Sequence, residues 1–296
     1  MLNCPNTPFR QRWLAWLLIG PQLLVTLVFF IWPALESIAQ SFYSQSFWGT
    51  ISHYIGWQNY TGLLGSPSYW QSIGLTLFFS VMVTLLTMLM GLYLALLVQK
   101  VRHGKRLYRT LFIWPYAVAP AVAGVLFGFL FNPAIGIVTY WLQHIDVNWN
   151  YFINGKQALT IAIIGSAWQQ ISYNFLFFLA GLSAIPSNLT EAAIIDGTNA
   201  WQRFIHIVLP LLSPISFFLL VMNLIYAFFD TFGLISTLTQ GGPHNSTNIL
   251  VYKVYQDGFI GQQIGSSSAQ SVILMITIAL LTILQFKYVE KRVHYQ

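Results

Sequence analysis

One short segment of this chain, residues 191–210, places acidic and basic residues at close spacing between apolar ones, and it reads EAAIIDGTNAWQRFIHIVLP. It contains Glu191, Asp196, Arg203 and His206, and long apolar runs flank it on both sides. An amphipathic segment of this kind is typical of a surface that contacts a membrane or another protein. Two interpretations of the pattern are open: a linker helix that lies on a membrane, or a knob that docks into another protein.

Capping residues divide this segment into two short helices. Ser187 is a good N-cap for a helix over 188–196, and Gly197 suits the left-handed position that ends a helix. Asn199 can cap a second helix over 200–207, which runs towards a Leu-Pro pair. The spacing therefore predicts two helices at an angle, joined at the glycine.

No set of residues in this sequence predicts a reaction. A phosphate-binding loop needs Ser or Thr after Gly-Lys, but the two Gly-Lys pairs, at 104–105 and 155–156, are followed by Arg and Gln. The single cysteine, Cys4, excludes an intrachain disulfide and a cysteine metal cluster. All six histidines lie outside the long apolar stretches, which argues against an intramembrane enzyme. We expect no catalytic residue, no metal and no cofactor in this chain.

The composition indicates that most of this chain lies in a lipid bilayer. Only 7% of the 296 residues are charged, whereas hydrophobic residues make up 56%. A soluble fold carries roughly 25% charged residues, so this chain could not solvate its surface in water. The net charge of +6 comes from residues that cluster in short loops, which is typical of topology signals and not of nucleic-acid binding.

Six stretches are long and apolar enough to cross a bilayer, which takes ~20 helical residues. They are residues 13–35, 72–98, 110–131, 158–182, 208–232 and 269–286. All but two of the 13 Lys and Arg residues then fall on one side, the exceptions being Lys156 and Lys253. By the positive-inside rule both termini are cytoplasmic. The predicted fold class is an all-α membrane protein with six transmembrane helices, and residues 183–207 lie inside the cell.

Polar side chains near mid-bilayer mark the most plausible substrate pathway. The predicted pathway residues are Trp168, Gln169, Gln170, Tyr173, Asn174, Asn223 and Tyr226. Ser216, Asn223 and Asp230 recur every seven residues, roughly on one helical face, and Asp230 falls near the headgroups as a possible outer gate. The alternative is that Gln169, Gln170 and Asn223 only hydrogen-bond neighbouring helices.

Small residues and prolines predict close packing of the third stretch. Ala117, Ala121, Gly124 and Gly128 form a stripe that lets another helix approach closely. Pro115 and Pro120 allow a kink in the same stretch. Thr76, Ser80, Thr84 and Thr87, in the second stretch, are interpreted as a further helix contact.

The amphipathic segment resembles the EAA loop of ABC-importer permeases of the carbohydrate type. The matching residues are Glu191, Ala192, Ala193, Asp196, Gly197, Ile207, Leu209 and Pro210. In that family the loop is a coupling helix that docks into a cleft of the ATP-hydrolysing subunit. The resemblance implies the same contact here, and it favours the docking knob over the membrane-surface linker.

The resemblance extends over almost the whole chain, through stretches such as WPYAVAPAVAGVLFGFLFNP, WQQISYNFLFFLAGLSAIP and TQGGP. It implies the type I importer permease fold, with a conserved transmembrane domain over 72–284 that contains the coupling loop 186–210. Residues 1–71 would form an N-terminal tail, first helix and outer loop, and residues 285–296 a cytoplasmic tail.

The likeness is greatest to permeases of glycerol 3-phosphate importers, and it implies sn-glycerol 3-phosphate as the substrate. It also implies a bacterial inner-membrane complex with a second permease, two ATP-binding subunits that carry ATP and Mg, and a periplasmic substrate-binding protein. No predicted span has a Lys or Arg near mid-depth, so a neutral sugar or polyol is an alternative substrate. A stand-alone secondary transporter is a further alternative, for which Asp230 is the sole candidate ion-coupling group.

Overall fold

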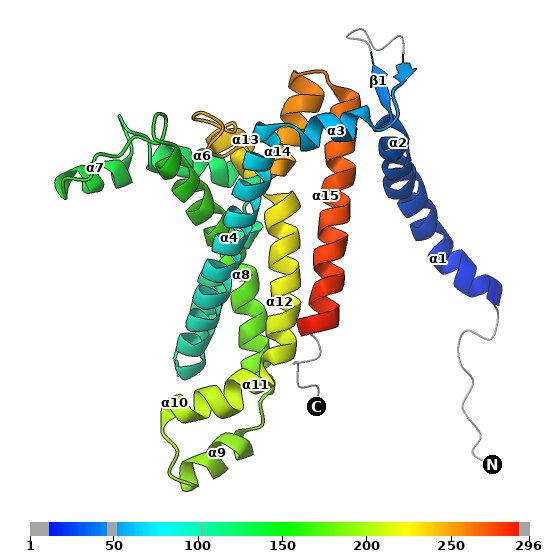
Figure 1. Ribbon diagram of the computed structural model, residues 1–296. Helices are drawn as coiled ribbons and strands as arrows, with labels where there is room; N and C mark the ends of the chain where they lie inside the picture. Colours follow the sequence, from blue (N-terminus) through cyan, green and yellow to red (C-terminus); the bar gives the residue numbers. More distant parts are fainter. Residues whose placement is uncertain (1–11, 46–51, 102, 290–296) are drawn as a thin grey trace. The chain divides into compact units, whose positions relative to one another are not determined.

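The computed structural model describes residues 12–45, 52–101 and 103–289 (Figure 1). Residues 1–11, at the start of the predicted segment 1–71, and residues 290–296 of the predicted tail 285–296 lie outside the described residues, and with them Cys4. The chain divides into two compact units, one of Met1–Gly65 with Asp257–Ile273 and one of Ser66–Gln256 with Leu274–Gln296.

The smaller unit begins with a helix that continues through a proline. Helix α1 (Arg12–Thr26) leads into a π-helical turn, η1 (Leu27–Ile31), and then into α2 (Trp32–Gln40). Pro33 has no N–H, and its ring would clash with the carbonyl of Phe29 in a regular helix. The turn accommodates it by widening, so that the N–H of Trp32 donates to the carbonyl of Leu27.

A hairpin and a short helix complete the smaller unit. Strands β1 (Tyr43–Gln45) and β2 (Ser52–Tyr54) are antiparallel, with Ser44 opposite His53, and α3 (Gln58–Leu64) follows. The Asn59 amide ties α3 to the hairpin by donating to the carbonyls of Ser41, at 2.8 Å, and Tyr43, at 3.1 Å. The unit also contains most of η5 (Gln256–Ile260) and the first half of α15 (Ile264–Leu284).

The described residues of the larger unit form helices joined by loops, with no strand. Its elements are α4 (Pro67–Lys100), α5 (Lys105–Ile113), η2 (Trp114–Ala117), α6 (Pro120–Leu130), α7 (Ile137–His144), α8 (Gly155–Ala184), α9 (Ser187–Ile195), α10 (Ala200–Arg203), η3 (Phe204–Val208), α11 (Leu209–Leu211), α12 (Ser213–Ile225), η4 (Tyr226–Asp230), α13 (Phe232–Leu238), α14 (Leu250–Tyr255), the second half of α15 and η6 (Gln285–Val289). Helices α4, α8 and α12 run side by side in Figure 1, and short elements gather at their two ends.

Helices α4 and α8 approach closely because small residues lie at their crossing. A Cβ atom on Gly91 would lie 2.6 Å from the Cβ of Asn174, so only glycine fits there. Thr76, Ser80 and Thr87 are buried along α4, and their hydroxyls donate to carbonyls of the same helix. The predicted helix contact along this stripe is confirmed.

The predicted kink in the third stretch is confirmed, and it is sharp. Residues Lys105–Ala117 and Pro120–Leu130 are bent by 100° relative to each other. Beyond the bend, Gly124 packs against α13, where an added Cβ would lie 2.7 Å from the carbonyl oxygen of Leu234. Ala121, Gly124 and Gly128 of the predicted stripe therefore lie in the close contact with neighbouring segments, whereas Ala117 lies in η2, before the bend, and is exposed.

The described residues contain four helices long and apolar enough to span a membrane, or up to six if each bent pair counts as one span. The all-α membrane fold is confirmed, apart from the short hairpin of the smaller unit. The number of six spans and the cytoplasmic termini stay predictions.

Candidate coupling loop and translocation cavity

The segment at 186–210 forms a separate two-helix knob at one end of the larger unit. Figure 1 shows α9 and α10 beyond the ends of α8 and α12. The chain bends by 67° between α8 and α9, and after α10 it returns through η3 and α11 into α12. The knob therefore joins two of the long helices, and a force on it reaches both.

Gly197 ends α9 in the left-handed conformation, as predicted, with a φ of +77°. The N–H of Gly197 donates to the carbonyl of Ile194 at 3.0 Å, and the N–H of Thr198 donates to that of Ala193 at 3.1 Å. This is the Schellman pattern, in which the last free carbonyls of a helix are satisfied by the turn that follows. The geometry of the corner is thus set by local hydrogen bonds.

Asn199 caps the second helix, also as predicted. Its side chain accepts from the N–H of Gln202 at 2.8 Å, and the Gln202 side chain accepts from the N–H of Asn199 at 2.9 Å, so the two form a capping box. The Arg203 guanidinium donates to the carbonyl of Thr198 and ties the new helix back to the corner. The turn between the two helices is rigid as a result.

The second helix continues through Pro210 by the same device that Pro33 uses. The π-helical turn η3 ends at Val208, two residues before the proline, and the N–H of Leu209 donates to the carbonyl of Phe204. The wider turn relieves the clash between the proline ring and the carbonyl four residues earlier.

One detail of the predicted knob is wrong. Pro186 takes the N-cap position, so Ser187 is the first residue of α9 and its side chain makes no capping bond. Ala193 is buried, at 8% exposure, because the backbone and hydroxyl of Thr198 fold back onto its carbonyl. Glu191, Ala192, Asp196, Gly197 and Leu209 are exposed, and Pro210 is partly buried.

The exposed apolar side chains of the knob were missed. Ile195 is 86% exposed, and Ile194 and Trp201 are also exposed beside the acidic residues. Apolar side chains ringed by polar ones at a protein surface mark an interaction site. The Ile-Ile pair next to the glycine was visible in the sequence, but its exposure depends on which face of α9 packs inward.

A network of amides joins the central part of α8 to the C-terminal part of α12. The side chains of Asn174 and Asn223 donate to each other, both at 2.8 Å, and Gln170 also donates to Asn223 at 3.2 Å. Asn174 and Asn223 are fully buried. For Asn223 the structure therefore favours the alternative role, hydrogen bonding between helices, over contact with a substrate, and Asn174, predicted only as a pathway residue, has the same role.

A cavity of about 410 Å³ lies beside this network. Five of the predicted pathway and gate residues line it, together with the bend around residues 116–120: Gln169, Gln170, Tyr173, Tyr226 and Asp230. The Gln169 amide donates to the carbonyl of Val118, and the Tyr226 hydroxyl donates to Gln169 Oε1 at 3.4 Å. Among the described residues that line the cavity, Asp230 is the one with a formal charge, and the others offer amides, hydroxyls and apolar surface.

Trp168, Asn174 and Asn223 do not line this cavity. Trp168 packs edge-on against Phe127, with ring centroids 5.6 Å apart. The expectation that Asn223 and Asp230 share one face is wrong, because Tyr226–Asp230 is π-helical. A π-helix has more residues per turn, so a spacing of seven no longer returns to the same face.

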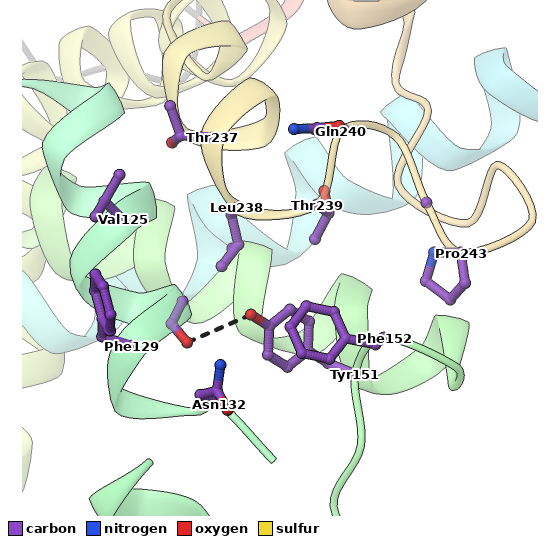
Figure 2. Close-up of a pocket in the computed structure, with 12 residues that line it drawn as sticks. Val125, Phe129, Asn132, Tyr151, Phe152, Thr237, Leu238, Thr239, Gln240 and Pro243 are labelled. Carbon is purple, nitrogen blue, oxygen red and sulfur yellow. Dashed lines mark hydrogen bonds between the residues drawn. The ribbon is translucent and has the colours of Figure 1, made fainter. Parts of the chain in front are cut away.

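A second cavity, of about 480 Å³, lies between α6, the loop before α8 and the end of α13 (Figure 2). Its lining includes Phe129, Asn132, Phe152 and Gln240, and Tyr151 donates from its hydroxyl to the carbonyl of Gly128 at 3.3 Å. Burial raises the pKa of Tyr151, so this phenol stays neutral. None of the predicted site residues lines this second cavity.

Comparison with known protein families shows which family this chain belongs to. Residues 88–295 match the family described as binding-protein-dependent transport system inner membrane component. The chain belongs to this family. It is therefore a membrane-spanning transport subunit, and the prediction that it has no ATPase site of its own is confirmed.

Individual relatives agree with this assignment. The sn-glycerol-3-phosphate transport system permease protein UgpA of Brucella abortus biovar 1 (strain 9-941) is 52% identical over 287 residues, which cover 97% of this chain and 98% of that protein. A bacterial ABC transporter involved in import of the acidic polysaccharide alginate has the same fold, with a TM-score of 0.81 at 21% identity over 94% of this chain and 96% of that one. The structure of the bacterial alginate transporter in complex with alginate pentasaccharide-bound periplasmic protein gives a TM-score of 0.79 at 22% identity over 92% of both chains.

Proposed function

We propose that this chain is a permease subunit of an ATP-driven importer of sn-glycerol 3-phosphate in the bacterial inner membrane. The observation that carries the proposal is 52% identity, over 97% of the chain, to a protein named for that transport system. In the proposed topology of six spans with both termini in the cytoplasm, the knob at 186–210 would lie inside the cell and Asp230, the proposed gate residue, near the outer surface.

The partners follow from the same likeness. The proposed complex contains a second permease of the UgpE type, two ATP-binding subunits of the UgpC type and a periplasmic binding protein of the UgpB type. ATP and Mg belong to the ATP-binding subunits. Support for an external binding protein comes from the alginate transporter, whose permease shares this fold and was solved with its periplasmic protein.

The knob would couple ATP binding to transport. Its acidic and apolar surface, with Ile195 and Trp201 exposed, would dock into an ATP-binding subunit. Because the corner at Gly197 is held by local hydrogen bonds, the knob would move as one piece when the two ATP-binding subunits close. Helices α8 and α12, which the knob joins, would then tilt and open or close the cavity between them.

The cavity would hold the substrate during its passage. Gln169, Gln170, Tyr173 and Tyr226 present amide and hydroxyl groups that can hydrogen-bond to the hydroxyls of a glycerol unit. In this chain the Asn174–Asn223 pair would position these groups and would not contact the substrate, because both side chains are fully buried.

A neutral sugar or polyol is the second candidate substrate. The favouring observation is the charge of the cavity, where Asp230 would repel a phosphate and the described lining residues include no Lys or Arg. The phosphate of glycerol 3-phosphate would therefore be bound by amide, hydroxyl and indole donors of this chain or by positive groups of the second permease.

The decisive experiment is uptake by the reconstituted complex in vesicles with ATP inside. Labelled glycerol 3-phosphate is the substrate, and unlabelled glycerol 3-phosphate, sugars, polyols and glycerophosphodiesters are competitors. The proposal predicts uptake that glycerol 3-phosphate suppresses and neutral sugars do not. ATP-dependent uptake of a neutral sugar, without uptake of glycerol 3-phosphate, would establish the second candidate instead.

A further inference from the structure

Helix α7 (Ile137–His144) has one exposed face that is made of apolar and aromatic side chains. Ile137, Tyr140, Trp141 and His144 are spaced at i, i+3, i+4 and i+7, so they share one side of the helix. All four are exposed, Trp141 at 66%. We call these four residues the open face of α7.

The opposite side of α7 packs against the end of α6 and is hydrogen-bonded to it. Thr139 is 1% exposed, and its hydroxyl donates to the carbonyl of Phe131 at 2.9 Å. The Asn132 side chain accepts from the N–H groups of Ala134, at 2.9 Å, and Ile135, at 3.3 Å. An added Cβ on Gly136 would lie 2.5 Å from the carbonyl oxygen of Leu130, so the corner closes only around glycine. The hydrogen bonds of Thr139 and Asn132 and the tight turn at Gly136 therefore fix the orientation of the open face relative to α6.

The three rings of the open face form one cluster. The Tyr140 and His144 rings have centroids 4.4 Å apart, and Trp141 lies 6.2 Å from each of them. His144 Nδ1 also lies 2.9 Å from the carbonyl oxygen of Tyr140, which anchors the imidazole to the helix. Tyr and Trp combine an apolar body with a polar edge, and such side chains concentrate where hydrocarbon meets headgroups.

The sequence around α7 continues the membrane-spanning composition. Between Arg109 and Asp146 there is no Asp, Glu, Lys or Arg, so α7 shares one uncharged run with the bent span before it. A face that docks onto a water-soluble partner is normally rimmed by polar and charged residues. In Figure 1 α7 extends from the end of α6, across the direction of α4 and α8 and away from both.

We propose that the open face of α7 lies in the headgroup region of the bilayer, so that α7 anchors the corner between α6 and α8 to the membrane surface. This goes beyond the transport function and does not depend on the substrate. The anchor would sit at the end of α8 opposite the coupling knob. It would hold that end at a fixed depth while the knob moves the other end.

Spin-label accessibility tests the proposal in the assembled complex. In a Cys4→Ser background, Trp141→Cys and Ile137→Cys place a nitroxide on the open face at two positions. Gln143→Cys places one on the exposed flank beside Thr139 as the matched control. Each variant complex is reconstituted in vesicles of phosphatidylethanolamine and phosphatidylglycerol, and ATP-driven uptake is measured to show that it is intact.

The expected result is that labels at 141 and 137 collide with molecular oxygen several-fold more often, relative to a water-soluble nickel chelate, than the label at 143 does. Labels at 141 and 137 that are as accessible to nickel as the label at 143 would show a face in water and overturn the proposal. Labels at 141 and 137 that are shielded from both reagents would show a protein partner there and overturn it equally. Ile137→Cys keeps the test decisive if Trp141→Cys does not assemble.

Discussion

The coupling knob and the cavity of this permease are built in opposite ways. Every hydrogen bond that shapes the knob joins residues at most five positions apart, as between Thr198 and Ala193 or Arg203 and Thr198. The amide network beside the cavity joins residues 49 and 53 positions apart. A region shaped by its own sequence can move as one piece, whereas a region shared between helices changes whenever those helices tilt. This difference is consistent with a knob that moves as a rigid body and a cavity that changes shape.

The largest expected effect comes from a change at the helix crossing that supports the pathway. Gly91→Ala places a Cβ 2.6 Å from the Cβ of Asn174 and forces α4 away from α8. Overpacking of this kind costs about 1–3 kcal/mol. We expect strongly reduced amounts of assembled permease in the membrane, measured by immunoblotting and by thermal unfolding in detergent.

Gly74→Ala is the matched control, on the same helix. An added Cβ at Gly74 meets nothing within 4 Å, so this change brings the gain in helix propensity without the clash. Equal thermal stability of the two variants would contradict the close crossing at Gly91.

The next largest effect is expected at the corner of the knob. Gly197→Val forces a β-branched residue into the left-handed region, at φ +77°, which costs roughly 1–2 kcal/mol and so shifts the population of the docking geometry by about 5–30-fold. ATP-driven uptake in vesicles should fall by a similar factor while the amount of inserted chain stays the same.

Gly104→Val controls for strain itself. Gly104 has a φ of +76°, and an added Cβ there, as at Gly197, meets nothing within 4 Å. The local strain is therefore matched, but Gly104 lies between α4 and α5, outside the knob. If both variants transport equally well, the corner at Gly197 has no special role in coupling.

A smaller effect is expected at the amide pair between α8 and α12. A double-mutant cycle of Asn174→Ala and Asn223→Ala should give a coupling energy of about 1 kcal/mol, within the range measured for hydrogen bonds between membrane helices. The measurement is unfolding of the single and double variants in denaturant. Strictly additive effects would show that the two side chains do not bond to each other.

The smallest effect is expected from the charge beside the cavity. Asp230→Asn removes a negative group from the lining, and like charges near a protein surface repel by on the order of 1 kcal/mol after screening. The half-saturating concentration for glycerol 3-phosphate uptake should fall a few-fold, with Asp230→Glu unchanged. If Asp230→Asn raises this concentration instead, Asp230 is a ligand for substrate hydroxyls.

The difference between knob and cavity also decides what could be predicted from the sequence. Gly197 and Asn199 were placed correctly because helix ends follow local rules. The bend at Pro115 and Pro120 was predicted for the same reason, but its angle of 100° was not, because the packing of α6 against α13 and α8 sets it.

Features that depend on contacts between distant residues could not be predicted from the sequence. The requirement for glycine at position 91 comes from Asn174, on another helix. The π-helical turn Tyr226–Asp230 broke the seven-residue spacing by which Asn223 and Asp230 were placed on one face. The sequence predicted these polar side chains as one group, whereas the structure divides them: Gln169 and Tyr226 line the cavity, and Asn174 and Asn223 form the contact between the helices.

The most direct test of the account is a crosslink from the exposed residue Ala192. In a Cys4→Ser background, Ala192→Cys is combined with single cysteines along the cleft of the ATP-binding subunit, and Ser68→Cys, exposed at the start of α4, is the control. The account predicts a crosslink from residue 192 whose yield changes between the nucleotide-free and ATP-bound complex, and none from residue 68. An actively transporting complex in which residue 192 never crosslinks to the ATP-binding subunit, in any nucleotide state, would contradict it.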